Sequence, residues 1–225
     1  MGNITPILDI GEMVVSLKEK DYFFRPSFEN LTRIGTPKEI VDVFTKLNNS
    51  EARKVIYDAS RTYGTVPPWL IKILNKPAYG RSVLSSAMII MQACCDMDCD
   101  DLVGEWLPGK RGLIYQPGLI EIKDIITIGK ELASHGIIGK AKIRKLQRHE
   151  NKTAFADEFK VIDYINAARA HFNMTRDEAS KLTMTEFQLM LNAKCPLEKG
   201  FTREEYDKVV NNYFEMKRKR CHKNK

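Results

Sequence analysis

The hydrophobic positions alternate near the N-terminus and then change to helical spacing. A polar stretch at 18–21 separates two alternating runs, whose apolar positions are Met13, Val15, Leu17, Tyr22 and Phe24. Alternation with a period of two on both sides of a short polar segment predicts a β-hairpin. Pro26 cannot donate a ladder hydrogen bond, so we expect it at an edge or at the end of a strand.

Helical patterns follow the hairpin. Thr36, Pro37 and Glu39 predict a helix start, because threonine can cap, proline fits the first turn and glutamate can reach back to the cap amide. The segment 82–95 is apolar on most faces, which predicts a central buried helix. A glycine-rich stretch at 104–118 predicts a loop or a small hairpin. The other expected helices cover approximately 51–63, 66–77, 121–134, 157–172, 176–181, 184–194 and 203–219.

The polar, unpatterned segment 149–154 is the expected domain boundary. It separates an N-terminal domain, 1–148, from a C-terminal helical domain, 155–225, that carries a basic tail. The last three expected helices each begin with a capping box, formed by Thr175 and Glu178, Thr183 and Glu186, and Thr202 and Glu205. The predicted fold is therefore mainly α: a helical bundle with an N-terminal β-hairpin and a small C-terminal helical subdomain.

The net charge of +7 suggests a nucleic-acid partner until its distribution is considered. The last nine residues, 217–225, contain six Lys or Arg and no acid, so the rest of the chain is nearly neutral. The sequence also lacks an apolar run of the roughly 18 residues that a membrane span needs and a secretory signal. We therefore expect no membrane association and a location in the cytoplasm where the protein is made.

The chemistry-bearing residues do not form a recognisable catalytic or metal-binding motif. The phosphate-binding, dinucleotide-binding, zinc-protease and nucleophile-elbow patterns are absent. Cys94, Cys95 and Cys99 form one cluster without a paired second half-site, which favours structural thiols over a zinc site. We expect no enzyme activity, no metal and no cofactor, although a spatial triad would be invisible to this search.

A basic segment at 140–148 is the candidate for phosphate contacts. Its five basic residues are Lys140, Lys142, Arg144, Lys145 and Arg148. The same spacing is typical of an amphipathic helix whose cations face water, and this interpretation is favoured because aromatic stacking residues are absent.

The expected helix at 184–194 carries an apolar ridge. Its residues are Met184, Phe187, Met190 and Leu191. A helix-turn-helix DNA reader would need positive donors here, and the helix contains no arginine and only one lysine. Two interpretations stay open: simple core packing, or a docking face on which methionine and phenylalanine give adaptable contact area.

The same region resembles the C-terminal signature of phage tail-assembly chaperones. The resemblance lies in a run of short motifs, namely Ala167–Arg169, Phe172–Thr175, Glu178–Ala179, Leu182–Thr183, Glu186–Phe187 and Leu191. The whole chain is also similar to an uncharacterised full-length family of tailed-bacteriophage proteins. The segments that carry this similarity are Ile4–Met13, His135–Ala141 and Gly200–Tyr206.

The resemblance implies a late, non-enzymatic protein that transiently binds tape-measure and tail-tube subunits before the tail polymerises. A tape-measure protein exposes apolar helical stripes before assembly, and a chaperone needs an apolar surface on a soluble body. The alternative is a small phage nucleic-acid-binding protein that uses the basic segment 140–148 and the basic tail. Self-association stays open. Nucleic-acid binding, if any, is expected to be weak and non-specific.

Overall fold

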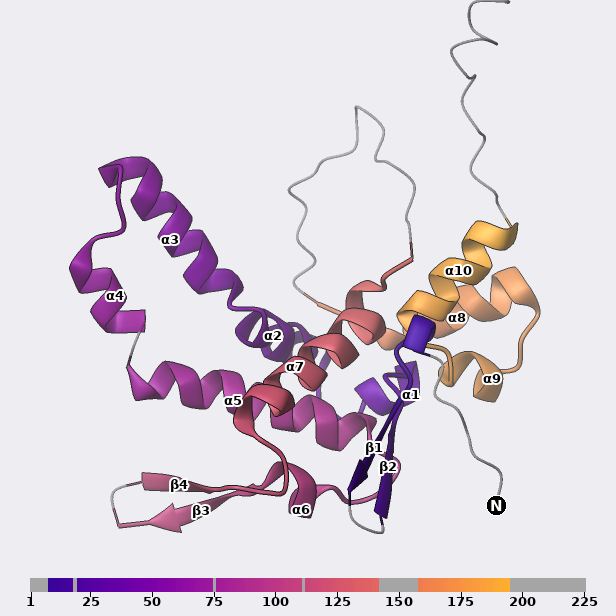
Figure 1. Cartoon of the computed structure of the whole chain (residues 1–225). Coiled ribbons are helices and arrows are strands. Elements are labelled where there is room, and N and C mark those ends of the chain that lie inside the picture. Colours follow the sequence, from indigo (N-terminus) through magenta and orange to yellow (C-terminus); the bar gives the residue numbers. More distant parts are fainter. Residues whose placement is uncertain (1–7, 18–19, 75, 111, 142–157, 195–225) are drawn as a thin grey trace, which may run out of the picture. The chain divides into compact units, whose positions relative to one another are not determined.

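A computed structural model of this protein describes residues 8–17, 20–74, 76–110, 112–141 and 158–194 (Figure 1). The described residues are mainly α, as the sequence predicted. The N-terminal elements are η1 (Leu8–Ile10), β1 (Met13–Leu17), β2 (Lys20–Phe24), α1 (Phe28–Leu31), α2 (Pro37–Leu47), α3 (Ser50–Tyr63) and α4 (Pro68–Leu74). The later elements are α5 (Pro77–Cys94), α6 (Asp100–Val103), β3 (Glu105–Gly109), β4 (Gly112–Gln116), α7 (Ile122–Ala133), η2 (Ser134–Ile138), α8 (Val161–Phe172), α9 (Arg176–Ser180) and α10 (Met184–Lys194).

The local signals in the sequence placed most element boundaries correctly. The predicted N-terminal hairpin is confirmed, with Met13 opposite Phe24 and Val15 opposite Tyr22. The glycine-rich stretch forms the second antiparallel hairpin, β3–β4. Thr36 and Glu39 form the predicted capping box, and so do Thr175 and Glu178. The third predicted box, at 202–205, and the helix at 203–219 lie outside the described residues.

Helix α5 begins earlier than the sequence analysis placed it. Pro77 was expected to end the preceding helix, but it occupies the first turn of α5, with Lys76 at the N-cap. A first-turn proline loses no helical hydrogen bond, so it starts α5 instead of stopping α4. Helix α8, by contrast, begins later than expected, at Val161 instead of at about 157.

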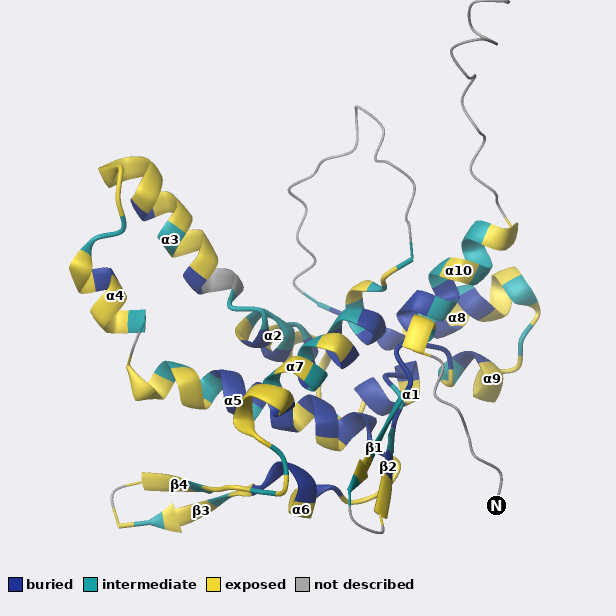
Figure 2. Cartoon of the chain, viewed as in Figure 1, coloured by how far each residue is buried: buried dark blue, intermediate teal, exposed yellow. Residues whose placement is uncertain are grey.

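The core is built around α5, as expected for a helix that is apolar on most faces. Its buried side chains include Leu84, Ile90 and Met91. The helix packs against α2 and α7, and Figure 2 shows buried residues along much of α5. Gly129 of α7 lies so close to Ala87 of α5 that an added Cβ would stand 3.0 Å from the Ala87 Cα. This close approach lets the two helices pack tightly across the centre of the fold.

The expected linker at 149–154 lies outside the described residues. Helices on both sides of it contribute to one hydrophobic cluster, which contains Ile125 of α7 and Ile165 of α8. The chain divides into a compact unit Met1–Leu191 and a second unit Asn192–Lys225. None of the described helices is long and apolar enough to cross a membrane.

Candidate functional site

The predicted apolar ridge of α10 is largely part of the core. Only 4% of Met184 and 6% of Phe187 is exposed, whereas Met190 and Leu191 are half-buried against the same cluster. Phe187 stands edge-on to three other rings, those of Phe28, Tyr164 and Phe172, each with its centroid 6.2 Å away. Such edge-to-face contacts are typical of a packed aromatic core. Of the two interpretations of the ridge, this geometry favours core packing for Met184 and Phe187.

An open groove lies beside this aromatic cluster. It has a volume of about 710 Å³ and is lined by Lys38, Glu158, Lys160, Asp163, Tyr164, Ala167 and Phe187. Three of its charged groups pair: Lys38 lies 3.7 Å and Lys160 3.3 Å from Glu158. Ion pairs of this kind are surface features that contribute little stability.

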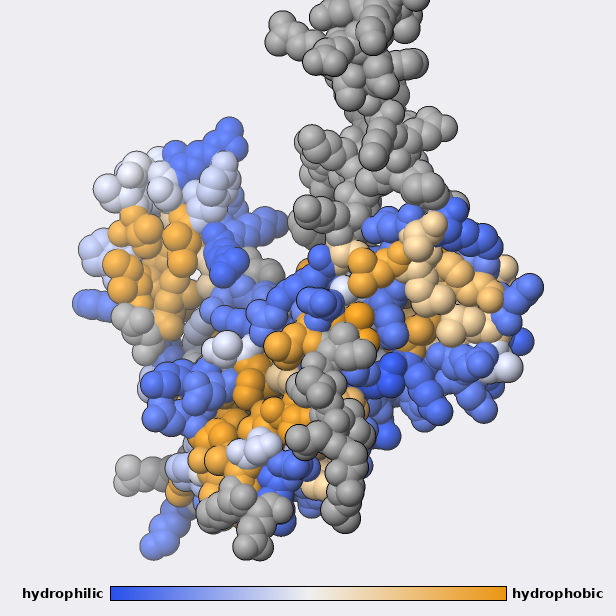
Figure 3. All heavy atoms as spheres, turned by 45° about the vertical axis from the view of Figure 1, so that its right-hand side comes forward, coloured by the Kyte–Doolittle hydropathy of each residue, from blue (hydrophilic) through white to orange (hydrophobic). Residues whose placement is uncertain are grey.

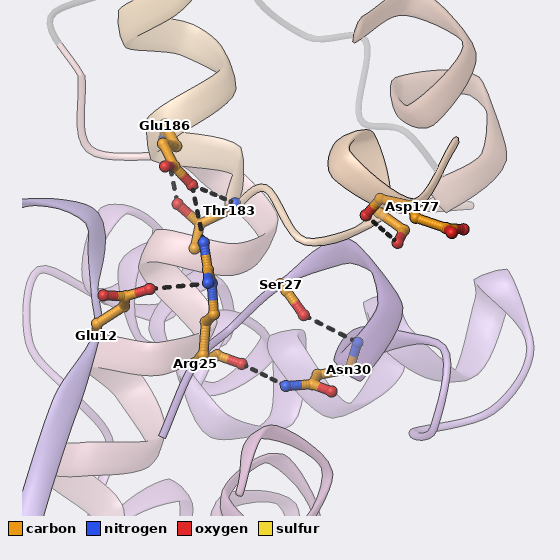
Figure 4. Close-up of polar contacts among 8 residues, drawn as sticks. Glu12, Arg25, Ser27, Asn30, Asp177, Thr183 and Glu186 are labelled. Atoms are coloured by element: carbon orange, nitrogen blue, oxygen red, sulfur yellow. Dashed lines mark hydrogen bonds and ion pairs between the residues drawn. The ribbon is translucent and has the colours of Figure 1, made fainter. Parts of the chain in front are cut away.

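A polar seam, defined here as Glu12, Arg25, Thr183 and Glu186, joins the N-terminal hairpin to α10 (Figure 4). Arg25 Nε lies 3.0 Å from Glu12 Oε1, and Arg25 Nη2 lies 3.6 Å from Glu186 Oε2. Glu186 also completes the predicted capping box, because its amide donates to Thr183 Oγ1 while its carboxylate accepts from the Thr183 amide. One arginine thus holds two carboxylates from distant parts of the sequence.

The electrostatics of the seam centre on Glu12. Burial raises the pKa of Glu12 above its usual value, and the neighbouring Arg25 partly opposes this shift. Glu186 and Asp96 add further negative charge that raises the pKa of Glu12. Because the charged groups face one another, the seam acts as a structural clamp between the N-terminal hairpin and α10.

A second polar contact ties the end of α7 to α10. The π-helical turn η2 places His135 Nδ1 3.0 Å from Thr185 Oγ1, and the Lys140 amide donates to the same oxygen over 3.0 Å. Gln188 donates from Nε2 to the Ile138 carbonyl at 2.6 Å. Burial, supported by the charge of Lys140, lowers the pKa of His135, while Glu131 opposes this. The buried imidazole is therefore held neutral at physiological pH.

This arrangement predicts a loss of stability in mild acid. The unfolded chain takes up a proton on His135 near pH 6.5, whereas the folded chain resists protonation until its lower pKa is reached. The stabilising contribution is thus complete above about pH 6.5 and falls as the pH drops toward the folded value. His135→Gln keeps a hydrogen-bonding group but cannot titrate. In this variant the free energy of unfolding, measured with urea, should depend less on pH between about pH 7 and pH 5. An unchanged pH dependence in this variant would contradict the assignment.

The structure describes only the first residue of the predicted phosphate-contact set. Lys140 forms an ion pair with Glu131, so its charge is already matched within the fold. Lys142, Arg144, Lys145 and Arg148 lie outside the described residues, as does the basic tail at 217–225.

The three described cysteines are free thiols buried beside the hairpin. Burial raises the pKa of Cys94 to about 12. A hydrogen bond from the Cys99 thiol lowers the pKa of Cys95 to about 7, and the same contact raises the pKa of Cys99. Among the described residues, no three His, Cys, Asp or Glu side chains are grouped so that they could hold a metal ion.

One exposed apolar surface was not singled out by the sequence analysis. It is the arm, defined here as α3 and α4, residues Ser50–Leu74. Asn49 and Gly64, both in the left-handed region, are the cap residues on either side of α3. The exposed apolar side chains of the arm are Val55, Tyr57, Tyr63, Trp69, Ile71 and Ile73. Figure 3 shows hydrophobic residues gathered on this part of the molecule.

Helix α4 has the apolar sequence of a buried helix, but most of its large apolar side chains are exposed to solvent. Lys72 is the only charged residue in Pro68–Leu74, yet Trp69 is 56%, Ile71 47% and Ile73 48% exposed. The side chains that the arm does bury, Ala52, Ala59 and Leu70, do not belong to the main hydrophobic cluster. A helix that is apolar on nearly all sides is normally covered by protein. Burial of each large apolar side chain is favourable by roughly 1.5–3 kcal/mol relative to exposure to water.

A signal for this surface is present in the sequence. The run Trp69–Ile73 within a short helix that is flanked by prolines leaves almost no polar face for water. Periodicity could place the helix, but the partner that covers it could not be identified from the same pattern.

Comparison with known proteins identifies a family but no characterised relative. No curated protein and no solved structure matches the chain significantly. One family model matches residues 24–208, from the second strand of the N-terminal hairpin to a point beyond α10, and it is described as a family of unknown function, DUF6246. The chain therefore belongs to this family of unknown function, DUF6246.

Proposed function

We propose that this protein is a non-enzymatic tail-assembly chaperone of a tailed bacteriophage, which binds tape-measure and tail-tube subunits in the host cytoplasm before the tail polymerises. The observation that carries the proposal is the arm, because α3 and α4 present six large apolar side chains to solvent outside the main core. Exposed apolar patches on a folded body are typical of protein-interaction sites.

The proposed action is transient capture of a partner helix. An amphipathic helix lays its apolar stripe on an apolar surface and is thereby kept from aggregating. The arm provides such a surface, whereas the clamp of Glu12, Arg25 and Glu186 uses its polar groups to hold the fold together. The exposed apolar surface is thus available for a partner while these polar groups stabilise the fold, which favours a binding protein over an enzyme.

The experiment that tests the proposal is co-expression with the neighbouring tail genes. Tape-measure and tail-tube subunits should co-purify with the wild-type chain and stay soluble. Trp69→Ser/Ile73→Ser should lose this effect, because it removes apolar contacts from the arm. The matched control, Leu113→Ser/Leu189→Ser, alters exposed apolar side chains outside the arm and should leave co-purification intact. Subunits that stay insoluble with the wild-type chain would reject the proposal.

The nucleic-acid alternative makes a separate prediction. Six of the basic residues lie at 217–225, and the described residue of the basic segment, Lys140, is paired with Glu131. We therefore expect weak, non-specific DNA retention at low salt, which deletion of 217–225 should abolish. Tight, sequence-selective binding at about 0.15 M salt, measured by fluorescence anisotropy, would replace the chaperone proposal with the alternative.

A further inference from the structure

We infer that the arm selects an acidic amphipathic helix, and does not bind a second copy of this chain. The inference rests on the proposed function, in which the arm is the surface that receives a partner. Its independent basis is the distribution of charge around the exposed apolar residues.

The charged residues of the arm are mostly cations. The exposed cations are Arg53, Lys54 and Arg61 on α3, Lys72 on α4 and Lys76 just after it. Within the described part of the chain, none of the five forms an ion pair, while other surface lysines, such as Lys46 and Lys123, do. The arm contains two acidic residues, Glu51 and Asp58, of which the side chain of Asp58 is described.

These cations border the apolar positions. Trp69 and Ile73 lie one helical turn apart on α4, and Lys72 follows Trp69 by three residues, so it neighbours Trp69 on the helix surface. On α3, Arg53 and Lys54 precede the exposed Tyr57 by four and three residues, so they neighbour it on the helix surface. A partner that covers the apolar side chains therefore brings its flanking residues beside lysine and arginine. Acidic residues in those flanking positions would be attracted and basic residues repelled.

The same charges argue against the other occupants of the arm. A second copy would place its own Arg53, Lys54 and Lys72 against an equally basic surface, and like charges across an interface cost binding energy. A single-stranded nucleic acid would suit the cations and the aromatic rings, since bases stack on aromatic side chains. However, Val55, Ile71 and Ile73 offer no stacking face, and they match the aliphatic stripe of a helix instead.

The test uses two synthetic peptides and the full chain. Both peptides are about 20 residues long, enough to form a stable helix, and share one leucine stripe. The first has glutamate and the second has lysine in the flanking positions. Fluorescence anisotropy of the labelled peptides at low salt should show roughly tenfold tighter binding of the acidic peptide.

Charge reversal distinguishes recognition from simple hydrophobic adhesion. Lys54→Glu/Lys72→Glu should weaken binding of the acidic peptide and strengthen binding of the lysine peptide. The preference for the acidic peptide then shrinks or inverts. The matched control, Lys110→Glu/Lys181→Glu, reverses exposed cations outside the arm and should preserve the preference. Equal binding of both peptides, or a preference that the arm reversal does not move, would overturn the inference.

Two further outcomes would also overturn it. One is a dimer in sedimentation analysis that Trp69→Ser dissolves, since the occupant would then be a second copy. The other is displacement of the acidic peptide by an oligothymidylate. If the peptide preference is absent while tail subunits still co-purify through the arm, the partner chemistry is wrong and the proposed function stands. If the preference is present but no tail subunit co-purifies, the proposed function is rejected and the preference remains.

Discussion

Replacing Phe187 by alanine should lower the free energy of unfolding by roughly 3–5 kcal/mol, the range for a large aromatic residue deleted from a core. Phe187 is almost fully buried and contacts the rings of Phe28, Tyr164 and Phe172. The residual cavity would lie where α1, α8 and α10 meet. Urea unfolding, followed by circular dichroism, provides the measurement.

Leu189 is the matched control on the same helix. It is 43% exposed, so Leu189→Ala should change the free energy of unfolding by no more than about 0.5 kcal/mol. If Phe187→Ala leaves the melting temperature unchanged but weakens binding to tail subunits, Phe187 belongs to a docking face, and its assignment to the core is wrong.

Replacing Arg25 by methionine should destabilise the protein by roughly 2–4 kcal/mol at neutral pH, because it leaves two carboxylates without their shared cation. Loss of Arg25 also removes the charge that lowers the pKa of Glu12, so the folded-state pKa of Glu12 rises further. An acid whose pKa is raised in the folded state destabilises that state when the acid is charged. The destabilisation should therefore be largest at neutral pH and should shrink as the pH falls and Glu12 becomes protonated.

Two variants isolate this effect. Glu12→Gln in the Arg25→Met background removes the unpaired charge and should recover part of the stability. Lys46→Met breaks an exposed ion pair with Asp42 and should cost at most about 1 kcal/mol. A pH-independent loss in Arg25→Met, with no recovery in the double variant, would show that Arg25 acts through packing alone.

The elements that could be predicted are those whose signals are local. Thr36 and Glu39 are three residues apart, and their capping box forms as the sequence indicates. The alternating positions from Met13 to Phe24 likewise determine the register of the first hairpin. Pro77 misled the prediction because proline marks either the end of one helix or the first turn of the next, and the sequence pattern does not distinguish the two.

The parts that could not be predicted depend on contacts across the sequence. The ridge of Met184 and Phe187 has the same helical spacing whether it faces a core or a partner, and only the rings around Phe187 favour the core. The clamp joins Arg25 to Glu186 across more than half the chain. The exposure of Trp69 and Ile73 was not predicted because the apolar pattern of their helix is that of a helix covered by protein.

Hydrogen–deuterium exchange of the co-purified complex tests the central claim most directly. The proposal predicts that amides of the arm exchange more slowly in the complex than in the free chain, because a bound helix covers α3 and α4. The amides of α10, already packed in the core, should change little. Protection that avoids the arm and falls on α10 or on the basic segment 140–148 would contradict the assignment of the arm as the binding surface.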